Sequence, residues 1–170
     1  AKVIIMGDMN DDPMDKSMAI ALGAKRKTQD TKEHDLYNPW WDTLKKGTGT
    51  LMYDGKWNLF DQIVFTGNLL GNDRSTLKYY RNEIFRRDYM FQKEGKYKGY
   101  PKRTHAGGVW LNGYSDHLPT IIYLINPLIG VDGVHSSGTV QDLHLIPFSS
   151  ASSHQSEVRG TKHGKDSLFG

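Results

Sequence analysis

Apolar residues gather into short runs separated by longer polar stretches. The run KVIIM at residues 2–6 is rich in β-branched residues and closes at Gly7, a pattern that predicts a buried strand. The run TIIYLI at residues 120–125 predicts a second buried strand.

A hairpin is predicted in the middle of the chain, within LMYDGKWNLFDQIVFTG. Its strands would be Leu51–Tyr53 and Asn58–Phe65, because the Asp54-Gly55 pair between them is a strong turn signal. The basic and aromatic stretch that follows has no comparable turn signal.

Two helices are expected. Asp12 followed by Pro13 is typical of a helix start, with the Asp as N-cap and the Pro at the first position. The stretch Met14–Leu22 fits that helix, and Gly23 fits its C-terminal cap. A second, short helix is expected near Trp40–Lys45.

The composition of the chain changes after residue 125. Residues 126–170 are rich in Ser, Gly and His, and their sparse apolar residues show no sustained period, which predicts an extension of unknown role rather than core. The histidines in it lack a regular metal-ligand spacing, so we expect them to be solvated: His135, His144, His154 and His163.

Size and charge narrow the function only slightly. The 170 residues suffice for one domain, and the net charge of +3 is compatible with a polyanionic partner without requiring one. The absence of cysteine excludes disulfides and thiolate metal sites. No apolar run is long enough to span a bilayer. The chain enters an apolar run directly after Ala1-Lys2, which is typical of a fragment, so a secreted or periplasmic location with a removed leader stays open.

Polar side chains stand at the ends of three β-branched runs. Asp8 and Asn10 follow the first run, Asp61 lies in NLFDQIVF, and Asp116-His117 precede the last. If the three runs are neighbours in one sheet, these groups converge at its edge, where active sites of layered folds commonly lie.

These residue types favour hydrolysis of a phosphate ester. A carboxylate such as Asp8 can orient water and help to hold a divalent cation, and Asn10 can contact a phosphoryl oxygen. His117 can donate to phosphate, best when protonated, and Asp61 is the carboxylate expected to orient it. The hard oxygens of Asp116 suit Mg²⁺ or Mn²⁺.

The segments IIMGDMND, WNLFDQIVF and GYSDHLPT resemble, in order and spacing, three signature segments of the endonuclease/exonuclease/phosphatase superfamily, the deoxyribonuclease-I-like hydrolases. YPKRTHAGG, ahead of the last segment, resembles bacterial members. The resemblance implies that Asp8 activates water and touches metal, and that Asn10 holds the scissile phosphate or the metal shell. It implies that His117 contacts the phosphate with Asp61 as its partner, and that Asp116 is a second metal-side carboxylate.

The resemblance also implies an α+β fold, a four-layer α/β/β/α sandwich made of two similar halves, of which residues 1–125 would be the C-terminal half. The N-terminal half would supply a metal-binding Glu, and the chain's own glutamates stand in other contexts: Glu33, Glu83, Glu94 and Glu157. The expected partners are therefore this missing half and a phosphate-ester substrate, nucleic acid or small molecule. The resemblance spans nucleases, inositol-phosphate phosphatases and sphingomyelinases. A non-catalytic binding module is the alternative.

Simpler readings exist for several residues. Asp8 and Asn10 could form only a turn, Asp61 could be an exposed strand residue, and His117 could be structural. The basic, aromatic stretch Arg74–Arg103 could form a phosphodiester groove. We favour instead a half-buried element whose aromatic residues face the core. Arg103 is the exception, and we expect it to contact the substrate. The tryptophans are expected to pack in the core or its rim: Trp40, Trp41, Trp57 and Trp110.

Overall fold

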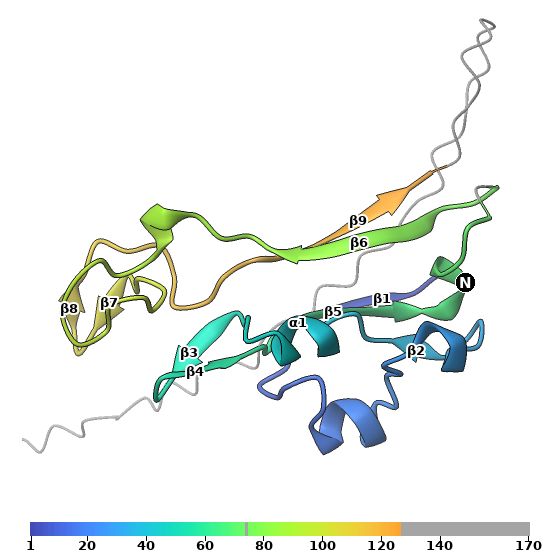
Figure 1. Cartoon of the computed structure of the whole chain (residues 1–170), viewed down its shortest axis with the longest axis horizontal. Coiled ribbons are helices and arrows are strands. Elements are labelled where there is room, and N and C mark those ends of the chain that lie inside the picture. Colours follow the sequence, from blue (N-terminus) through green and yellow to red (C-terminus); the bar gives the residue numbers. More distant parts are fainter. Residues whose placement is uncertain (74, 127–170) are drawn as a thin grey trace, which may run out of the picture.

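The computed structural model describes residues 1–73 and 75–126, which form short strands joined by loops and single helical turns (Figure 1). The strands are β1 (Ile4–Asp8), β2 (Leu36–Tyr37), β3 (Leu51–Tyr53), β4 (Lys56–Asn58), β5 (Asp61–Thr66), β6 (Lys78–Ile84), β7 (His105–Ala106), β8 (Val109–Trp110) and β9 (Thr120–Ile125). The helical segments are η1 (Ser17–Ala21), η2 (Thr28–Asp30), α1 (Trp41–Lys45), η3 (Gly67–Leu69) and η4 (Asp88–Met90). The mixture is consistent with the predicted α+β class, and the 126–170 extension lies outside the described residues except for Asn126.

β5, which carries most of the second motif, lies at the centre of a three-stranded antiparallel sheet of order β1-β5-β2. The predicted turn at Asp54-Gly55 is present, with φ values of 46° and 75°. The predicted second hairpin strand is wrong in its extent, because pairing with β3 ends at Asn58. The chain then changes sheets, and Asp61–Thr66 pairs with β1 instead.

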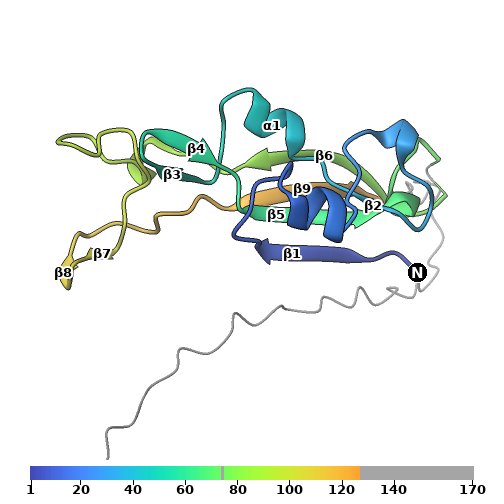
Figure 2. The same cartoon turned by 90° about the horizontal axis from the view of Figure 1, so that it is seen from below.

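The last apolar run does not join that sheet. It forms β9, which pairs antiparallel with β6 in a separate two-stranded sheet. The expectation that three runs are neighbours in one sheet is therefore wrong for the third. The two sheets pack against each other instead, with the ring of Phe65 on β5 lying 4.8 Å from that of Tyr79 on β6 (Figure 2).

The two faces of β5 serve two cores, because successive strand residues point to opposite sides. Ile63 belongs to the cluster with Trp40 and Leu59, against which Ile122 of β9 packs. Val64 faces the other way, into a cluster with Ala24 and with Met18 of η1. By the same alternation Asp61 shares the face of Ile63, so it points toward the β6–β9 sheet.

The helix expected from Met14 to Leu22 is shorter. It is the single wide turn η1, closed by a hydrogen bond from Leu22 N to Ser17 O at 2.7 Å. The predicted cap at Asp12 is wrong, since the Asp12 carboxylate accepts a hydrogen bond from Leu59 N at 2.7 Å instead. The predicted terminator Gly23 is confirmed, with a φ of 71°. The short helix near Trp40–Lys45 is also confirmed, as α1.

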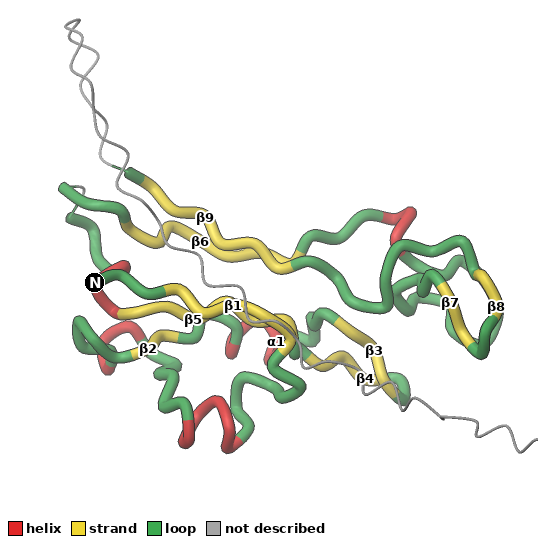
Figure 3. Tube along the Cα trace, turned by 180° about the vertical axis from the view of Figure 1, so that it is seen from behind, coloured by secondary structure: helices red, strands yellow, loops and turns green. Residues whose placement is uncertain are grey.

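The first and last strands are less buried than predicted. Val3 and Met6 are 43% and 39% exposed, because the outer edge of β1 has no strand partner among the described residues. Every residue of β9 is only half-buried, and its second edge is likewise unpaired in this part of the chain. Figure 3 follows both strands along the two stacked sheets, with the β7–β8 hairpin at the opposite end of the molecule from the N-terminus.

The basic, aromatic stretch behaves in part as predicted. Tyr79 faces the core, where burial raises the pKa of its hydroxyl. Tyr80 and Tyr97, in contrast, are 63% and 54% exposed. None of the helices within residues 1–73 and 75–126 is long and apolar enough to cross a membrane.

Candidate active site

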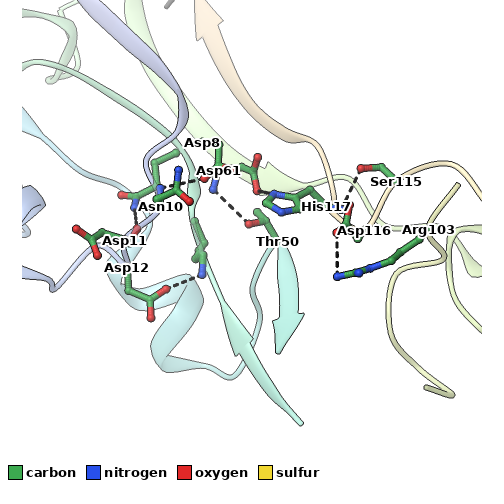
Figure 4. Close-up of polar contacts among 12 residues, drawn as sticks. Asp8, Asn10, Asp11, Asp12, Thr50, Asp61, Arg103, Ser115, Asp116 and His117 are labelled. Carbon is green, nitrogen blue, oxygen red and sulfur yellow. Dashed lines mark hydrogen bonds and ion pairs between the residues drawn. The ribbon is translucent and has the colours of Figure 1, made fainter. Parts of the chain in front are cut away.

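The centre of the site is a pair of side chains, one from the start of β5 and one from the loop before β9. His117 Nδ1 lies 2.7 Å from Asp61 Oδ2 (Figure 4). An ionised carboxylate only accepts hydrogen bonds, so Nδ1 carries the proton and donates it, which leaves Nε2 for another partner. The two side chains are 27% and 23% exposed, so the pair is partly shielded yet reachable.

Asp8 stands beside this pair because it is the register partner of Asp61 in the antiparallel sheet. The hydrogen bond from His117 to Asp61 raises the pKa of the imidazole, and the charges of Asp61, Asp116 and Asp8 raise it further, against the opposing effect of burial. The pair therefore favours an imidazolium, which can donate from both ring nitrogens.

Asn10 is held next to Asp8 by a tight turn. Its backbone N–H donates to Asp8 Oδ1 at 2.9 Å, and its φ of 54° places it in the left-handed region that Asn tolerates better than most residues. Both Asp8 and Asn10 are exposed, so their free oxygens and the amide are accessible. The turn thus presents a carboxylate and a neutral amide at one point.

The turn is attached to β5 on both sides. Met9 N donates to Phe60 O at 2.8 Å, and Gln62 Nε2 donates to Asp11 O at 2.7 Å. Asp12 Oδ1 accepts from Leu59 N at 2.7 Å, and burial raises the pKa of the Asp12 carboxyl although this hydrogen bond lowers it. These bonds fix the turn relative to Asp61 on the same strand.

Gln62 also connects the turn to buried polar residues of the core. Its Oε1 accepts from Asn38 Nδ2 at 2.7 Å, and both residues are fully buried. Asn38 Oδ1 in turn accepts from Trp40 N at 3.0 Å. Buried polar groups that are all satisfied in this way give a rigid support, since each bond would be costly to leave unmade.

Thr50 is a residue that the sequence interpretation missed. It is fully buried, its carbonyl accepts from Leu118 N at 2.7 Å, and its hydroxyl accepts from Asp61 N at 3.3 Å. One residue thus holds the backbone on each side of the Asp61–His117 pair. No sequence signal marks it, because a buried Thr in GTGT resembles any loop residue.

Asp116 lies beside His117 in the chain but turns the other way. Its Oδ2 is 3.1 Å from Arg103 Nη2, and the two side chains are 45% and 56% exposed (Figure 4). The structure therefore brings together Asp8, Asn10, Asp61 and His117, and places Asp116 with Arg103 at the side. The ion pair engages one nitrogen of the Arg103 guanidinium, which keeps further N–H donors for a substrate phosphate.

A glycine sets the distance between these two loops. A Cβ on Gly113 would come within 2.1 Å of Lys102 O and 2.2 Å of Arg103 O, so only glycine fits there. Tyr114 N also donates to Lys102 O at 2.9 Å. The Arg103 loop is thus packed directly on the segment that leads into Asp116 and His117.

The site offers few protein ligands to a divalent cation. Within residues 1–73 and 75–126, no group of three or more His, Cys, Asp or Glu side chains is placed to hold a metal ion. Mg²⁺, however, is usually held by one or two carboxylates together with waters and substrate phosphates rather than by an all-protein cage. The accessible oxygens of Asp8 and Asn10 fit that partial role.

One comparison of the sequence with known proteins finds a match. A family model described as "Endonuclease/Exonuclease/phosphatase family" matches residues 1–126. No curated protein and no solved structure matches the chain. The family match spans all the residues gathered at the site, and it implies a deoxyribonuclease-I-like fold and a general phosphoesterase or nuclease activity. The chain belongs to the endonuclease/exonuclease/phosphatase family.

Proposed function

We propose that the chain carries the catalytic residues of a metal-dependent phosphoesterase in which water attacks phosphorus in line. The observation that supports this most directly is the 2.7 Å contact between His117 Nδ1 and Asp61 Oδ2, with Asp8 opposite Asp61 in the sheet register. An imidazole paired with a carboxylate, next to an exposed carboxylate and an amide, can transfer protons and stabilise charge on a phosphoryl group. The substrate is a phosphodiester or phosphomonoester.

Each residue has a distinct role in this proposal. Asp8 orients the attacking water and accepts its proton, since its carboxylate is exposed. His117 donates from Nε2 to a phosphate oxygen, and Asp61 keeps the imidazole in the orientation and protonation state that this requires. Asn10 donates its amide to another phosphoryl oxygen. Arg103 binds the substrate phosphate once it leaves Asp116.

The cation would be Mg²⁺ or Mn²⁺, held by Asp8 and Asn10, with Asp116 as a further carboxylate. When bound, it neutralises negative charge on the phosphoryl group. The ion pair with Arg103 engages one carboxylate oxygen of Asp116, so its loss would free both oxygens for the cation. A substrate phosphate is a stronger attraction for Arg103 than a solvent-exposed carboxylate, so substrate binding would release Asp116.

The test is a magnesium titration of the full chain with bis(p-nitrophenyl) phosphate. His117→Ala should lower the rate about 10²–10⁴-fold, the range that a positioned acid–base group contributes. His34→Ala, at an exposed histidine of the loop before β2, is the matched control and should leave the rate unchanged. Turnover by the unchanged chain that His117→Ala leaves undiminished would refute the proposal.

We further propose that residues 1–125 form the C-terminal half of a four-layer sandwich and that residues 126–170 are a separate extension. The unpaired outer edges of β1 and β9 support this, since both could accept strands of another half. That half would also supply the remaining metal ligand. In this case Met6→Lys, which puts a charge on the exposed part of β1, should weaken assembly with a separately expressed N-terminal half.

The alternative is a non-catalytic binding module or an inactive half-domain. The engagement of Asp116 by Arg103 and the lack of a three-ligand cluster among the described residues favour it. The same titration separates the two. A chain shown to be folded by circular dichroism that gives no turnover at any magnesium concentration would support the module.

A further inference from the structure

A cleft of about 680 Å³ lies next to the Arg103–Asp116 pair, and apart from these two residues none of its lining has a role in the proposed catalysis. One wall is β3 with the turn residue Asp54, and the other is the loop that carries Lys96, Tyr97 and Tyr100. Its size falls in the range of small-molecule sites in proteins, roughly 300–1,000 Å³.

The two walls are fixed to each other. Gly55 N, in the β3–β4 turn, donates to the hydroxyl of Tyr100 at 2.7 Å. Outside the cleft lining, the rings of Trp57 on β4 and Phe91 meet edge to face at 6.4 Å, and the guanidinium of Arg86 lies over both. The cleft is therefore preformed rather than a gap between loose loops.

The cleft is continuous with the proposed catalytic site. Asp116, next to His117 in the chain, lines it, and so does Arg103. At the other wall, β3 begins directly after Thr50, whose carbonyl holds Leu118 N. A substrate whose phosphate meets His117 would place its next chemical group in this cleft.

The lining predicts what that group is. Tyr53 and Tyr97 are 74% and 54% exposed, so a flat partner can reach the ring of Tyr53 and the face of Tyr97 that Lys96 does not cover. Lys96 and Gln92 provide polar contacts, and Lys96 Nζ lies 5.4 Å from the Tyr97 ring centre. The two cations of the lining are matched by two acids, so the cleft suits an uncharged ring better than a second phosphate.

We propose that this cleft is a subsite for a nucleobase joined through its sugar to the phosphate at His117. The ring stacks against Tyr97, and its polar edge meets Gln92 and Lys96. Stacking on an aromatic side chain contributes to the binding of any base, because every base has a π-face. This inference rests on the proposed function, since it assumes that His117 receives the phosphate.

The test is calorimetric titration of the full chain with adenosine 5′-monophosphate and with ribose 5-phosphate, with and without Mg²⁺. We expect the nucleotide to bind about tenfold more tightly, the typical order of one base-stacking contact. Tyr97→Ala should remove this difference and leave the affinity for ribose 5-phosphate unchanged. Tyr97→Phe should retain the difference.

Tyr80→Ala is the matched control, because Tyr80 is as exposed as Tyr97 but lies on β6, outside the cleft lining. Equal affinities for the two ligands, or an equal loss from Tyr80→Ala and Tyr97→Ala, would overturn the subsite. Hydrolysis of bis(p-nitrophenyl) phosphate that depends on His117, combined with equal affinities, would remove the subsite and leave the proposed function standing. A base-dependent affinity without any turnover would support the subsite and count against the proposed function.

A base could come from a free nucleotide or from single-stranded nucleic acid. A pentanucleotide that binds more tightly than the mononucleotide, with an affinity that falls steeply with salt, identifies the strand as the source. An affinity equal to that of the mononucleotide identifies the free nucleotide. Failure of both ligands to distinguish Tyr97→Ala from the unchanged chain overturns the subsite.

Discussion

Two neighbouring residues, Asp116 and His117, each form an ion pair, and the two pairs differ in kind. The His117–Asp61 pair is 2.7 Å long with side chains about one-quarter exposed, at 27% and 23%. The Asp116–Arg103 pair is 3.1 Å long with side chains about half exposed, at 45% and 56%. A single step along the chain therefore separates a shielded pair from an open one.

The difference follows from what holds each pair. Asp61 begins β5, the most buried strand, and Thr50 binds the backbone beside both partners. Arg103 and Asp116 both lie in loops, and a close backbone contact at Gly113 is what brings them together. The comparison teaches that the first pair is built to persist through a reaction, whereas the second can exchange partners when a phosphate arrives.

The largest expected effect is that of Asp61→Asn on activity. The change replaces the charge-assisted hydrogen bond that contributes most to the raised pKa of His117 with at most a bond to a neutral amide, so the pKa should fall and the rate should drop about 10²-fold or more. The alkaline limb of the pH–rate profile should move to lower pH. Asp116→Asn should lower the same pKa by less, because Asp116 acts on the imidazole only through its charge.

The measurement is a pH series of kcat/KM together with NMR titration of the His117 ring in each variant. The comparison of the two pairs would break if Asp116→Asn moved the ring titration as far as Asp61→Asn does.

The next largest effect is expected from Gly113→Ala. The added methyl group would overlap the carbonyls of Lys102 and Arg103, so the free energy of unfolding should fall by about 1–3 kcal/mol, as for other overpacked sites. Urea unfolding checks this. A loss no greater than that of Arg103→Ala would mean that the two loops separate freely and that the close contact fixes nothing.

A smaller effect is expected on the pH dependence of stability. The folded-state pKa of His117 is raised, so its pairing contributes stability that is fully present below the pKa of an unfolded-chain histidine and is lost as pH rises through the folded value. Urea midpoints should therefore decline across that window. Asp61→Asn should flatten the decline, and His34→Ala should leave it in place. A decline of equal slope in Asp61→Asn would assign it to another group.

The smallest effect is that of Arg103→Ala on stability. Exposed ion pairs contribute about 0.2–1 kcal/mol, so the unfolding free energy should change little. Substrate affinity should fall nonetheless if Arg103 binds phosphate. Thermal unfolding and KM measured on one preparation test both statements, and a variant that loses stability without any change in KM would make Arg103 purely structural.

The sequence pattern predicted some strands and turns but not β6, the longest strand, nor the partner of β9. The run at 120–125 matches β9 residue for residue, and the Asp54-Gly55 turn is where it was expected. Periodicity tells which residues face one way and says nothing of which strand lies alongside. For that reason the pairing of β9 with β6 in a second sheet came only from the structure.

The site was predicted by residue type but not by its connections. The Asp61–His117 pair was expected from the chemistry of a carboxylate and an imidazole, and it is present. The ion pair of Arg103 with Asp116, and the support from Thr50, depend on contacts between residues far apart in the chain. Asp12 shows the same limit, because a distant amide at Leu59 outcompetes the local helix cap.

The left-handed turn at Asn10 also has a consequence for how this gene can vary. A single-base change in an asparagine codon gives Asp, His, Tyr, Ser, Thr, Ile or Lys, but never Gly, the residue best suited to a φ of 54°. Asp and His also adopt this conformation more often than most residues. Asp would add a charge beside Asp8, and His would replace a small neutral amide with a titrating ring. Point mutation therefore offers this codon no conservative neighbour, and a functional lineage should rarely leave it.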